Sequence, residues 1–177
     1  MSEMLIPVAT EWQTINSLRL IANQMISKAG SGHPGIALGA APILYELYAN
    51  QLVVDPQNAD MINRDRFVLS AGHGAALLYA TLHIAGFNLS SDDLAQFRMP
   101  HSKTPGHPEV GVTPGVEATT GPLGQGLDMA VGMAMAEAKL HEQFPNVIDH
   151  FTYSLVGDGD LMEGVSHETA SLAGQQS

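Results

Sequence analysis

The sequence predicts an α/β fold in which helices cover both faces of a parallel sheet. Two short apolar segments, residues 66–70 and 151–156, have the composition of buried strands. Longer segments with apolar residues at helical spacing lie around and between them. Short apolar strands separated by helices indicate parallel pairing, because parallel strands need a crossover connection. The 177 residues are enough for one domain with a hydrophobic core.

Two helices are expected before the first strand. Apolar residues at helical spacing predict the first helix over residues 10–28, with Thr10 as its N-cap. A glycine-rich break at residues 29–35 ends this helix. A second helix is predicted from residue 36 or 39 to residue 50, with Pro42 in its first turn, where a missing N–H costs nothing.

The first strand is followed by an Ala-Gly-His-Gly turn that opens a helix. This helix is predicted over residues 75–85 and is closed by Gly86. Ser90 or Ser91 then caps a short helix over residues 92–97.

The second half of the chain begins with a long loop. Residues 99–121 are rich in proline and glycine, and an ordered loop of this length is often functional. Residues 124–144 are helix-like and apolar on several sides, so this helix is predicted to be buried, in this core or in an interface. The strand at 151–156, a glycine-rich turn and a helix rich in Ala and Leu complete the order.

Composition excludes several classes of function. The formal net charge is −11 with only 7 Lys and Arg, which argues against a nucleic-acid partner. The absence of cysteine excludes disulfides and thiol chemistry. We read no signal peptide and no apolar run long enough to cross a bilayer, so no membrane partner is expected and the expected location is the cytoplasm.

Three histidines share one local pattern. His33, His73 and His107 each follow a glycine, in a loop or at the start of a helix. The glycine leaves the imidazole accessible and lets a ligand approach the backbone. A lone histidine is more often structural, but three in the same setting favour a binding site. The other histidines, except the undecided His101, lie on predicted helices or a strand edge and are interpreted as structural: His83, His141, His150 and His167.

Residues 157–164 suit a metal-bound diphosphate. Asp158 stands between two glycines directly after the second strand, where its carboxylate can bind a hard cation such as Mg²⁺. Ligands of parallel α/β folds bind at the carboxyl ends of strands, which is also where His73 is expected. Two nucleotide motifs fail, since Met162 replaces the last glycine of a dinucleotide fingerprint and Val165 replaces the P-loop lysine. A plain surface turn remains an alternative.

Two further features of this region have a structural and a functional interpretation. The segment 121–126, which contains Leu123, is either a turn with a closely packed helix start or a backbone wall against a flat ring. Asp160 and Glu163 are expected to be solvated, unless a partner subunit covers them.

Taken together, the motifs resemble those of transketolases. Five segments occur in the order typical of that family: Ser31-Gly32-His33-Pro34-Gly35, Ser70-Ala71-Gly72-His73-Gly74, Lys103-Thr104-Pro105-Gly106-His107-Pro108-Glu109, Thr120-Gly121-Pro122-Leu123-Gly124-Gln125-Gly126 and Gly157-Asp158-Gly159. The resemblance implies a thiamine-diphosphate-binding fold, a homodimer, and transfer of a two-carbon ketol unit from a ketose phosphate to an aldose phosphate, a reaction of the pentose phosphate pathway. The expected cofactors are thiamine diphosphate and Mg²⁺, or Ca²⁺ or Mn²⁺ in its place.

The resemblance also implies roles for individual residues. His33 and His107 are expected to bind substrate hydroxyls near the reacting carbon, and Glu163 to lie at a subunit contact near the cofactor. The remaining expected roles are diphosphate binding for His73 and Gly159, contact with the aminopyrimidine ring for Gly121 and Leu123, and metal binding for Asp158.

The family's later segments bear on what this chain can do alone. By resemblance, residues 1–177 are an N-terminal diphosphate-binding domain that ends before its C-terminal portion, without the pyrimidine-binding and C-terminal domains. We therefore expect the 177-residue chain to be inactive by itself. Alternatives are a binding module or subunit of a split thiamine-diphosphate enzyme, or a related ketol transferase such as dihydroxyacetone synthase.

Overall fold

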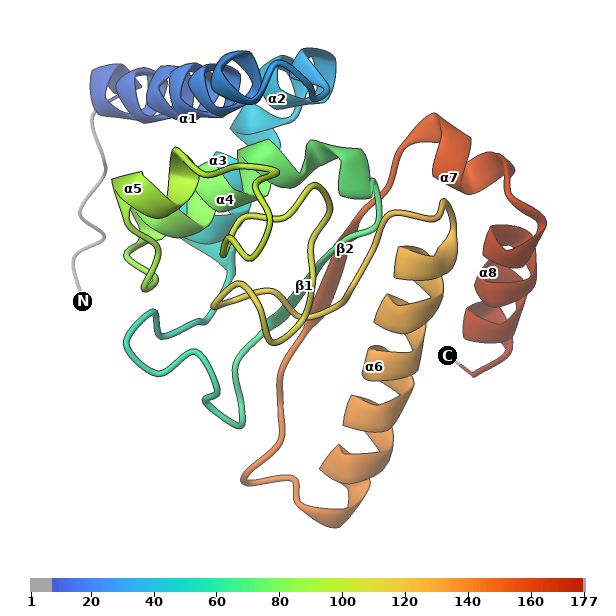
Figure 1. The fold of residues 1–177 in the computed structure, drawn as a ribbon. Helices are drawn as coiled ribbons and strands as arrows, with labels where there is room; N and C mark the ends of the chain where they lie inside the picture. Colours follow the sequence, from blue (N-terminus) through green and yellow to red (C-terminus); the bar gives the residue numbers. More distant parts are fainter. Residues whose placement is uncertain (1–7, 177) are drawn as a thin grey trace.

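The computed structural model describes residues 8–176 and consists of helices around a small sheet (Figure 1). In chain order the elements are α1 (Val8–Ala29), α2 (Pro34–Gly39), α3 (Ala41–Glu46), the π-helical turn η1 (Leu47–Gln51), β1 (Arg66–Leu69), the 3₁₀ turn η2 (Gly72–Gly74), α4 (Ala75–Ala85), α5 (Ser91–Leu94), α6 (Gln125–Gln143), β2 (Thr152–Leu155), α7 (Asp158–Met162) and α8 (Gly164–Gln176).

The prediction of a parallel sheet with helices on both faces is confirmed. β1 and β2 pair in parallel, with Arg66 opposite Thr152 and Leu69 opposite Leu155. Side chains alternate between the two faces of β1. Phe67 and Leu69 join the main core with residues of α1, α3 and α4. Val68 points to the other face and contacts a smaller cluster that includes Ala130 of α6.

The first helix begins earlier than predicted. The expectation that Thr10 is its N-cap is wrong, because α1 already includes Val8. Thr10 instead lies within the helix, where its carbonyl oxygen accepts a hydrogen bond from the Thr14 hydroxyl at 2.9 Å. The apolar spacing is confirmed on the buried face, where Ile15 and Leu18 are almost fully covered.

The second helix is interrupted at Ala40, whereas the prediction was one continuous helix to residue 50. Pro42 lies in the first turn of α3, as expected. Proline has no N–H to donate to the residue four positions earlier, so a helix through this point would leave the carbonyl of Leu38 without a partner. The Arg19 Nε of α1 donates to that carbonyl at 3.0 Å. The break is therefore stabilised by a contact from a neighbouring helix.

The ends of α4 and α5 follow the predicted signals. Gly86 ends α4 in the left-handed conformation, with φ of 94°. Ser90 is the cap of α5, and its side chain accepts from the Asp93 N–H while Asp93 accepts from the Ser90 N–H. α5 ends at Leu94, so it is shorter than the predicted 92–97 helix. The loop at 99–121 contains no helix or strand and is held by internal hydrogen bonds.

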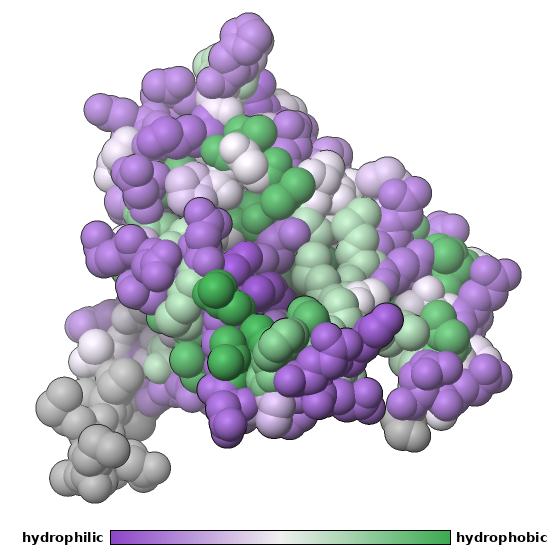
Figure 2. Space-filling model, turned by 90° about the horizontal axis from the view of Figure 1, so that it is seen from below, coloured by the Kyte–Doolittle hydropathy of each residue, from purple (hydrophilic) through white to green (hydrophobic). Residues whose placement is uncertain are grey.

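The sequence predicted that α6 is buried either in this core or in an interface, and the structure excludes the first of these positions. Within α6 only Gly126 and Ala130 are buried, and Met135 and Leu140 remain 38% and 42% exposed. The apolar character of the helix was read correctly, but this chain covers only one of its sides. An interface on α6 stays a prediction. β2 is likewise half-buried rather than fully buried. On the face drawn in Figure 2, apolar side chains form several patches between polar ones.

The helices of the described residues 8–176 include none that is long and apolar enough to cross a membrane.

Candidate functional site

A cleft of about 700 Å³ lies at the carboxyl ends of β1 and β2. Its volume falls in the range of small-molecule and cofactor sites. All the site residues predicted from the sequence except Glu163 line it: His33, His73, His107, Gly121, Leu123, Asp158 and Gly159. These residues come from five separate segments of the chain, so the fold brings the predicted motifs together in one place.

Backbone geometry places His33 and His73 at this cleft. His33 precedes Pro34, and the proline ring keeps its backbone extended, with φ of −121° and ψ of 91°. His33 is thus the residue before the first turn of α2. His73 lies in η2, the short turn directly after β1. The two rings meet edge to face, with centroids 5.1 Å apart.

The imidazole of His73 is held in its neutral form. Burial lowers its pKa below the ordinary value of 6.5, and the nearby His33 and His107 lower it further. The carboxylate of Asp160 opposes this shift. A neutral imidazole has one N–H donor and one acceptor nitrogen, so His73 can donate a hydrogen bond to a phosphate oxygen near neutral pH.

His107 is carried by the long loop, which α4 holds in place. The hydroxyl of the buried Tyr79 lies 3.0 Å from the carbonyl oxygens of both Pro105 and His107. Burial lowers the pKa of the His107 imidazole, and the positive charge of Arg98 and the proximity of His33 add to the effect. His107 is therefore also expected to be neutral near pH 7.

Gly121 fits against His107 without room for a side chain. Its φ is 149°, and a Cβ at this position would lie 3.2 Å from the His107 ring. The preceding residue, Thr120, donates from its hydroxyl to the Leu69 carbonyl at 2.7 Å and from its N–H to the Pro108 carbonyl at 3.1 Å. These bonds attach the loop to the end of β1 and place Gly121 beside η2.

The turn after β2 presents one carboxylate to the cleft and buries another. Asp158 is exposed and opens α7. Asp160 is only 1% exposed, so the expectation that it is solvated is wrong. Its carboxylate accepts from the N–H groups of Gly124 and Gly157, both at 2.9 Å. Asp160 thereby connects the turn after β2 to the start of α6.

Glu163 is not among the residues that line the cleft. It is exposed, at the end of α7, which agrees with the expectation of a solvated side chain in the absence of a partner. Its expected position at a subunit contact stays a prediction.

Several residues of this site were missed in the sequence. Ile36 and Ile43, from α2 and α3, form an apolar wall of the cleft. Asp160 was misjudged, although a carboxylate three residues after a helix cap is a recognisable capping signal. Arg98 contacts Ser31 at 3.1 Å, and its Nε is buried without a hydrogen-bond partner.

The cleft has the donors and the shape that a metal-bound diphosphate with a flat ring requires. The exposed carboxylate of Asp158 supplies an oxygen ligand of the kind that Mg²⁺ prefers. His73 supplies a hydrogen-bond donor, and Leu123 and Ile43 supply exposed apolar surface. At Gly159 a Cβ would come within 3.5 Å of Leu123, so a larger side chain there would narrow the space.

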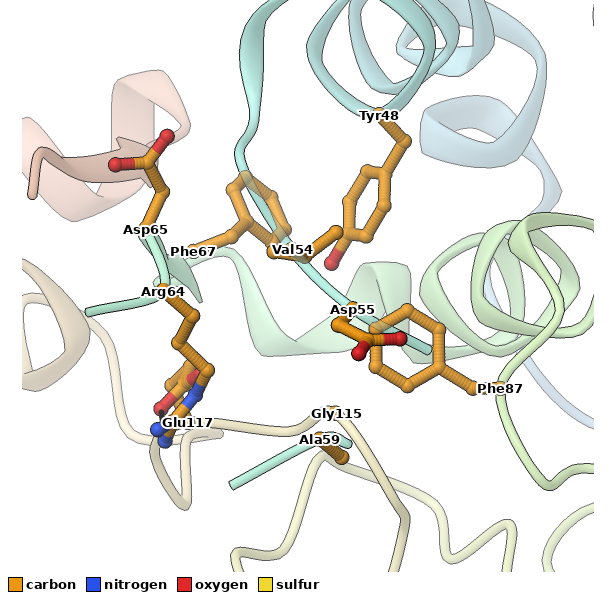
Figure 3. A pocket seen from close by; sticks show the side chains of 10 residues that line it. All are labelled: Tyr48, Val54, Asp55, Ala59, Arg64, Asp65, Phe67, Phe87, Gly115 and Glu117. Carbon is orange, nitrogen blue, oxygen red and sulfur yellow. Dashed lines mark hydrogen bonds and ion pairs between the residues drawn. The ribbon is translucent and has the colours of Figure 1, made fainter. Parts of the chain in front are cut away.

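A second hollow does not suit a ligand. It lies between Tyr48, Phe67 and the Arg64–Glu117 ion pair, and its volume of about 10 Å³ holds one water molecule at most (Figure 3). In Figure 3 the side chains of Arg64 and Glu117 point toward each other, and both guanidinium–carboxylate bonds are short, at 2.7 and 2.8 Å. The Arg64–Glu117 ion pair therefore stabilises the fold and does not form part of a ligand site.

Comparison with known proteins identifies the family. A family model described as the thiamine diphosphate binding domain of transketolase matches residues 10–177. The chain belongs to the transketolase family. The transketolase of Bacillus subtilis is 58% identical over 168 residues, which cover 93% of this chain and 25% of that protein. This match favours transketolase over a related ketol transferase such as dihydroxyacetone synthase.

Solved transketolase structures share the fold. A structure from Campylobacter jejuni superposes with a TM-score of 0.93 at 50% identity, covering 97% of this chain and 27% of that one. A transketolase from Pichia stipitis in complex with sedoheptulose-7-phosphate has a TM-score of 0.89 at 47% identity, covering 93% of this chain and 25% of that one. The chain spans about a quarter of the length of the curated transketolases that it matches.

Proposed function

We propose that this chain is the diphosphate-binding part of a transketolase, which moves a two-carbon ketol unit from a ketose phosphate to an aldose phosphate. The observation that carries the proposal is the convergence of three histidines and Asp158 on one cleft, in a member of the transketolase family. The likeness to the Pichia stipitis transketolase in complex with sedoheptulose-7-phosphate supports sugar phosphates as substrates.

The residues of the cleft divide into three tasks. Asp158 holds a divalent metal, with Mg²⁺ as the first choice, and this metal neutralises the diphosphate. His73 and the backbone of Gly159 bind the diphosphate oxygens. Gly121 and Leu123 form the surface against which the flat pyrimidine ring lies.

His33 and His107 face the reacting end of the cleft. Thiamine diphosphate, when bound, would supply the nucleophilic carbon that the transfer requires. The two imidazoles bind the hydroxyls of the sugar, orient it and exchange protons with its oxygens. The lowered pKa of His107 suits this task, because a neutral imidazole can both donate and accept a proton.

The cleft needs further metal ligands that this chain does not supply. Mg²⁺ needs nearly octahedral coordination, and Asp158 together with the diphosphate supplies only part of it. We propose that a homodimer of the whole protein completes the site, with Glu163 at the contact between subunits. The 177-residue chain alone is expected to be inactive.

Calorimetric titration with thiamine diphosphate and Mg²⁺ tests the proposal. Because its site is incomplete, the wild-type chain is expected to bind the pair weakly, and Asp158→Ala is expected to abolish this binding, because it removes the carboxylate that holds the metal. Glu168→Ala, which removes an exposed carboxylate from α8, is the matched control and should leave binding unchanged. Equal binding by Asp158→Ala and the wild type would contradict the metal assignment.

An activity assay addresses the second part of the proposal. A ketose phosphate and an aldose phosphate are incubated with the chain, thiamine diphosphate and Mg²⁺. No turnover is expected, and robust turnover would show that residues 1–177 contain a complete site.

A further inference from the structure

A second group of metal-ligating side chains lies at the far end of α6. Glu137, His141 and Asp149 each offer one ligand atom, and these atoms all lie within 4.8 Å of one another. Gln125, at the other end of α6, follows the loop that lines the cleft. Glu137 is twelve residues further along, which corresponds to about 18 Å of helix axis. The group is therefore separate from the cleft described above (Figure 1).

Helix geometry brings two of the three ligands together. Glu137 and His141 are four residues apart on α6, so their side chains project from the same face. Asp149 comes from the segment that leads from α6 back to β2. Its backbone is held by Asn63, whose side-chain oxygen accepts from the Asp149 N–H at 2.6 Å. The position of Asp149 is thus fixed by Asn63, a residue that is not one of the three ligands.

The imidazole of His141 makes a hydrogen bond of the kind that metal-binding histidines make. Its Nδ1 lies 2.5 Å from the carbonyl oxygen of Ile148. A carbonyl oxygen can only accept, so Nδ1 is the donor of this bond, and Nε2 is the ring nitrogen left for a metal. Metal-binding histidines almost always donate their second ring N–H in this way, which fixes the tautomer and the ring orientation. The buried Ile148 keeps this carbonyl in place.

The two carboxylates have no competing cation. Among residues 8–176, no ion pair involves Glu137 or Asp149. The group places two carboxyl side chains close together in a chain whose formal net charge is −11. A divalent cation would balance the local charge.

We propose that Glu137, His141 and Asp149 bind a divalent transition-metal ion of the zinc type. One imidazole nitrogen and two carboxylate oxygens are ligands that Zn²⁺ accepts, with water in the remaining position, whereas Mg²⁺ prefers oxygen ligands alone. The ion would connect the C-terminal end of α6 to the segment that leads into β2. The proposal does not depend on the function of the cleft.

Calorimetric titration of the 177-residue chain with ZnCl₂ tests the site. The wild type is expected to bind one ion here, and both His141→Ala and Glu137→Gln are expected to weaken binding at least about tenfold. Glu137→Gln keeps the size and helical preference of the side chain, so it tests whether Glu137 binds the metal even if His141→Ala disturbs the fold. Circular dichroism verifies the fold of each variant.

Matched controls separate this site from others. His167→Ala and Glu142→Gln remove an exposed imidazole from α8 and an exposed carboxylate from α6, and both should bind Zn²⁺ like the wild type. Asp158→Ala should also retain this binding, because its carboxylate belongs to the cleft. The proposal is overturned if the wild type binds no Zn²⁺, or if Glu137→Gln binds it as tightly as the wild type.

Discussion

The imidazole rings of His33 and His73 lie edge to face, with centroids 5.1 Å apart and planes at 68°. One ring belongs to the residue before α2 and the other to the turn after β1, so the contact joins two segments that are distant in sequence. At this distance two protonated imidazoles would repel each other. The contact therefore links the charge state of His73 to the presence of His33.

We expect His33→Gln to raise the pKa of both His73 and His107. Burial is the main cause of the lowered pKa of each, but His33 contributes to both shifts. Its removal should therefore move both pKa values part of the way back toward 6.5. NMR titration of the histidine ring protons measures the change. If neither pKa moves in a variant that folds like the wild type, the rings do not interact electrostatically as described.

The lowered pKa values also predict how stability depends on pH. In the native state His73 and His107 bind protons less readily than in the unfolded chain, whose histidines titrate near 6.5. Between 6.5 and the lower native pKa values the unfolded state therefore binds more protons, and the free energy of unfolding falls as the pH falls. Above this window both states hold neutral imidazoles and the contribution is constant.

Urea unfolding between about pH 7.5 and pH 5.5 tests this dependence. The wild type should lose stability across the range, and the double variant His73→Gln/His107→Gln should lose less. Parallel curves for the two proteins would mean that other groups cause the dependence.

Replacing Asp160 should destabilise the chain much more than replacing Asp158. Asp160→Ala leaves the N–H groups of Gly124 and Gly157 without their acceptor and is expected to cost about 2–3 kcal/mol of stability. Asp158→Ala removes an exposed side chain and should cost less than about 0.5 kcal/mol. Urea unfolding measures both. The stability of Asp160→Asn, which keeps one acceptor oxygen, should lie between those of the two alanine variants. Equal stability of all variants would show that the hydrogen bonds of Asp160 to Gly124 and Gly157 do not stabilise the fold.

The position of the site was predictable because it follows from chain topology. Parallel strands place the turns after them at one edge of the sheet, so His73 and Asp158 were expected to meet there, and they do. The recurring Gly-His pattern identified His33 and His107. The roles of these residues in catalysis and cofactor binding stay predictions, since position alone does not test them.

Features that depend on distant partners were not predictable. The break at Ala40 is stabilised by Arg19, which lies in another helix. The burial of Asp160 depends on an N–H of Gly124, in a loop far away in the sequence. The exposure of α6 could not be predicted from its apolar residues. An apolar helix face indicates that some other segment packs against it, but the composition does not show whether that segment belongs to this chain.

The start of α6 packs directly against Ser70, the residue after β1. A Cβ on Gly126 would lie 2.4 Å from the Cα of Ser70, which is backbone and cannot move aside alone. Gly126→Ala should therefore push the start of α6 away from the end of β1, at a cost of at least about 2 kcal/mol. The same displacement moves the loop that carries Gly121 and Leu123, so binding of thiamine diphosphate should weaken as well.

Gly132→Ala is the matched control, on the same helix. Apart from its chain neighbours and the nearby backbone of its own helix, no atom of residues 8–176 lies within 4 Å of a Cβ at Gly132. The substitution therefore removes only the conformational cost of glycine and should stabilise the chain by up to about 1 kcal/mol. Urea unfolding should thus move the two variants in opposite directions. If Gly126→Ala were as stable as Gly132→Ala, α6 would not lie directly on Ser70, and the wall of the cleft formed by residues 121–124 would need another support.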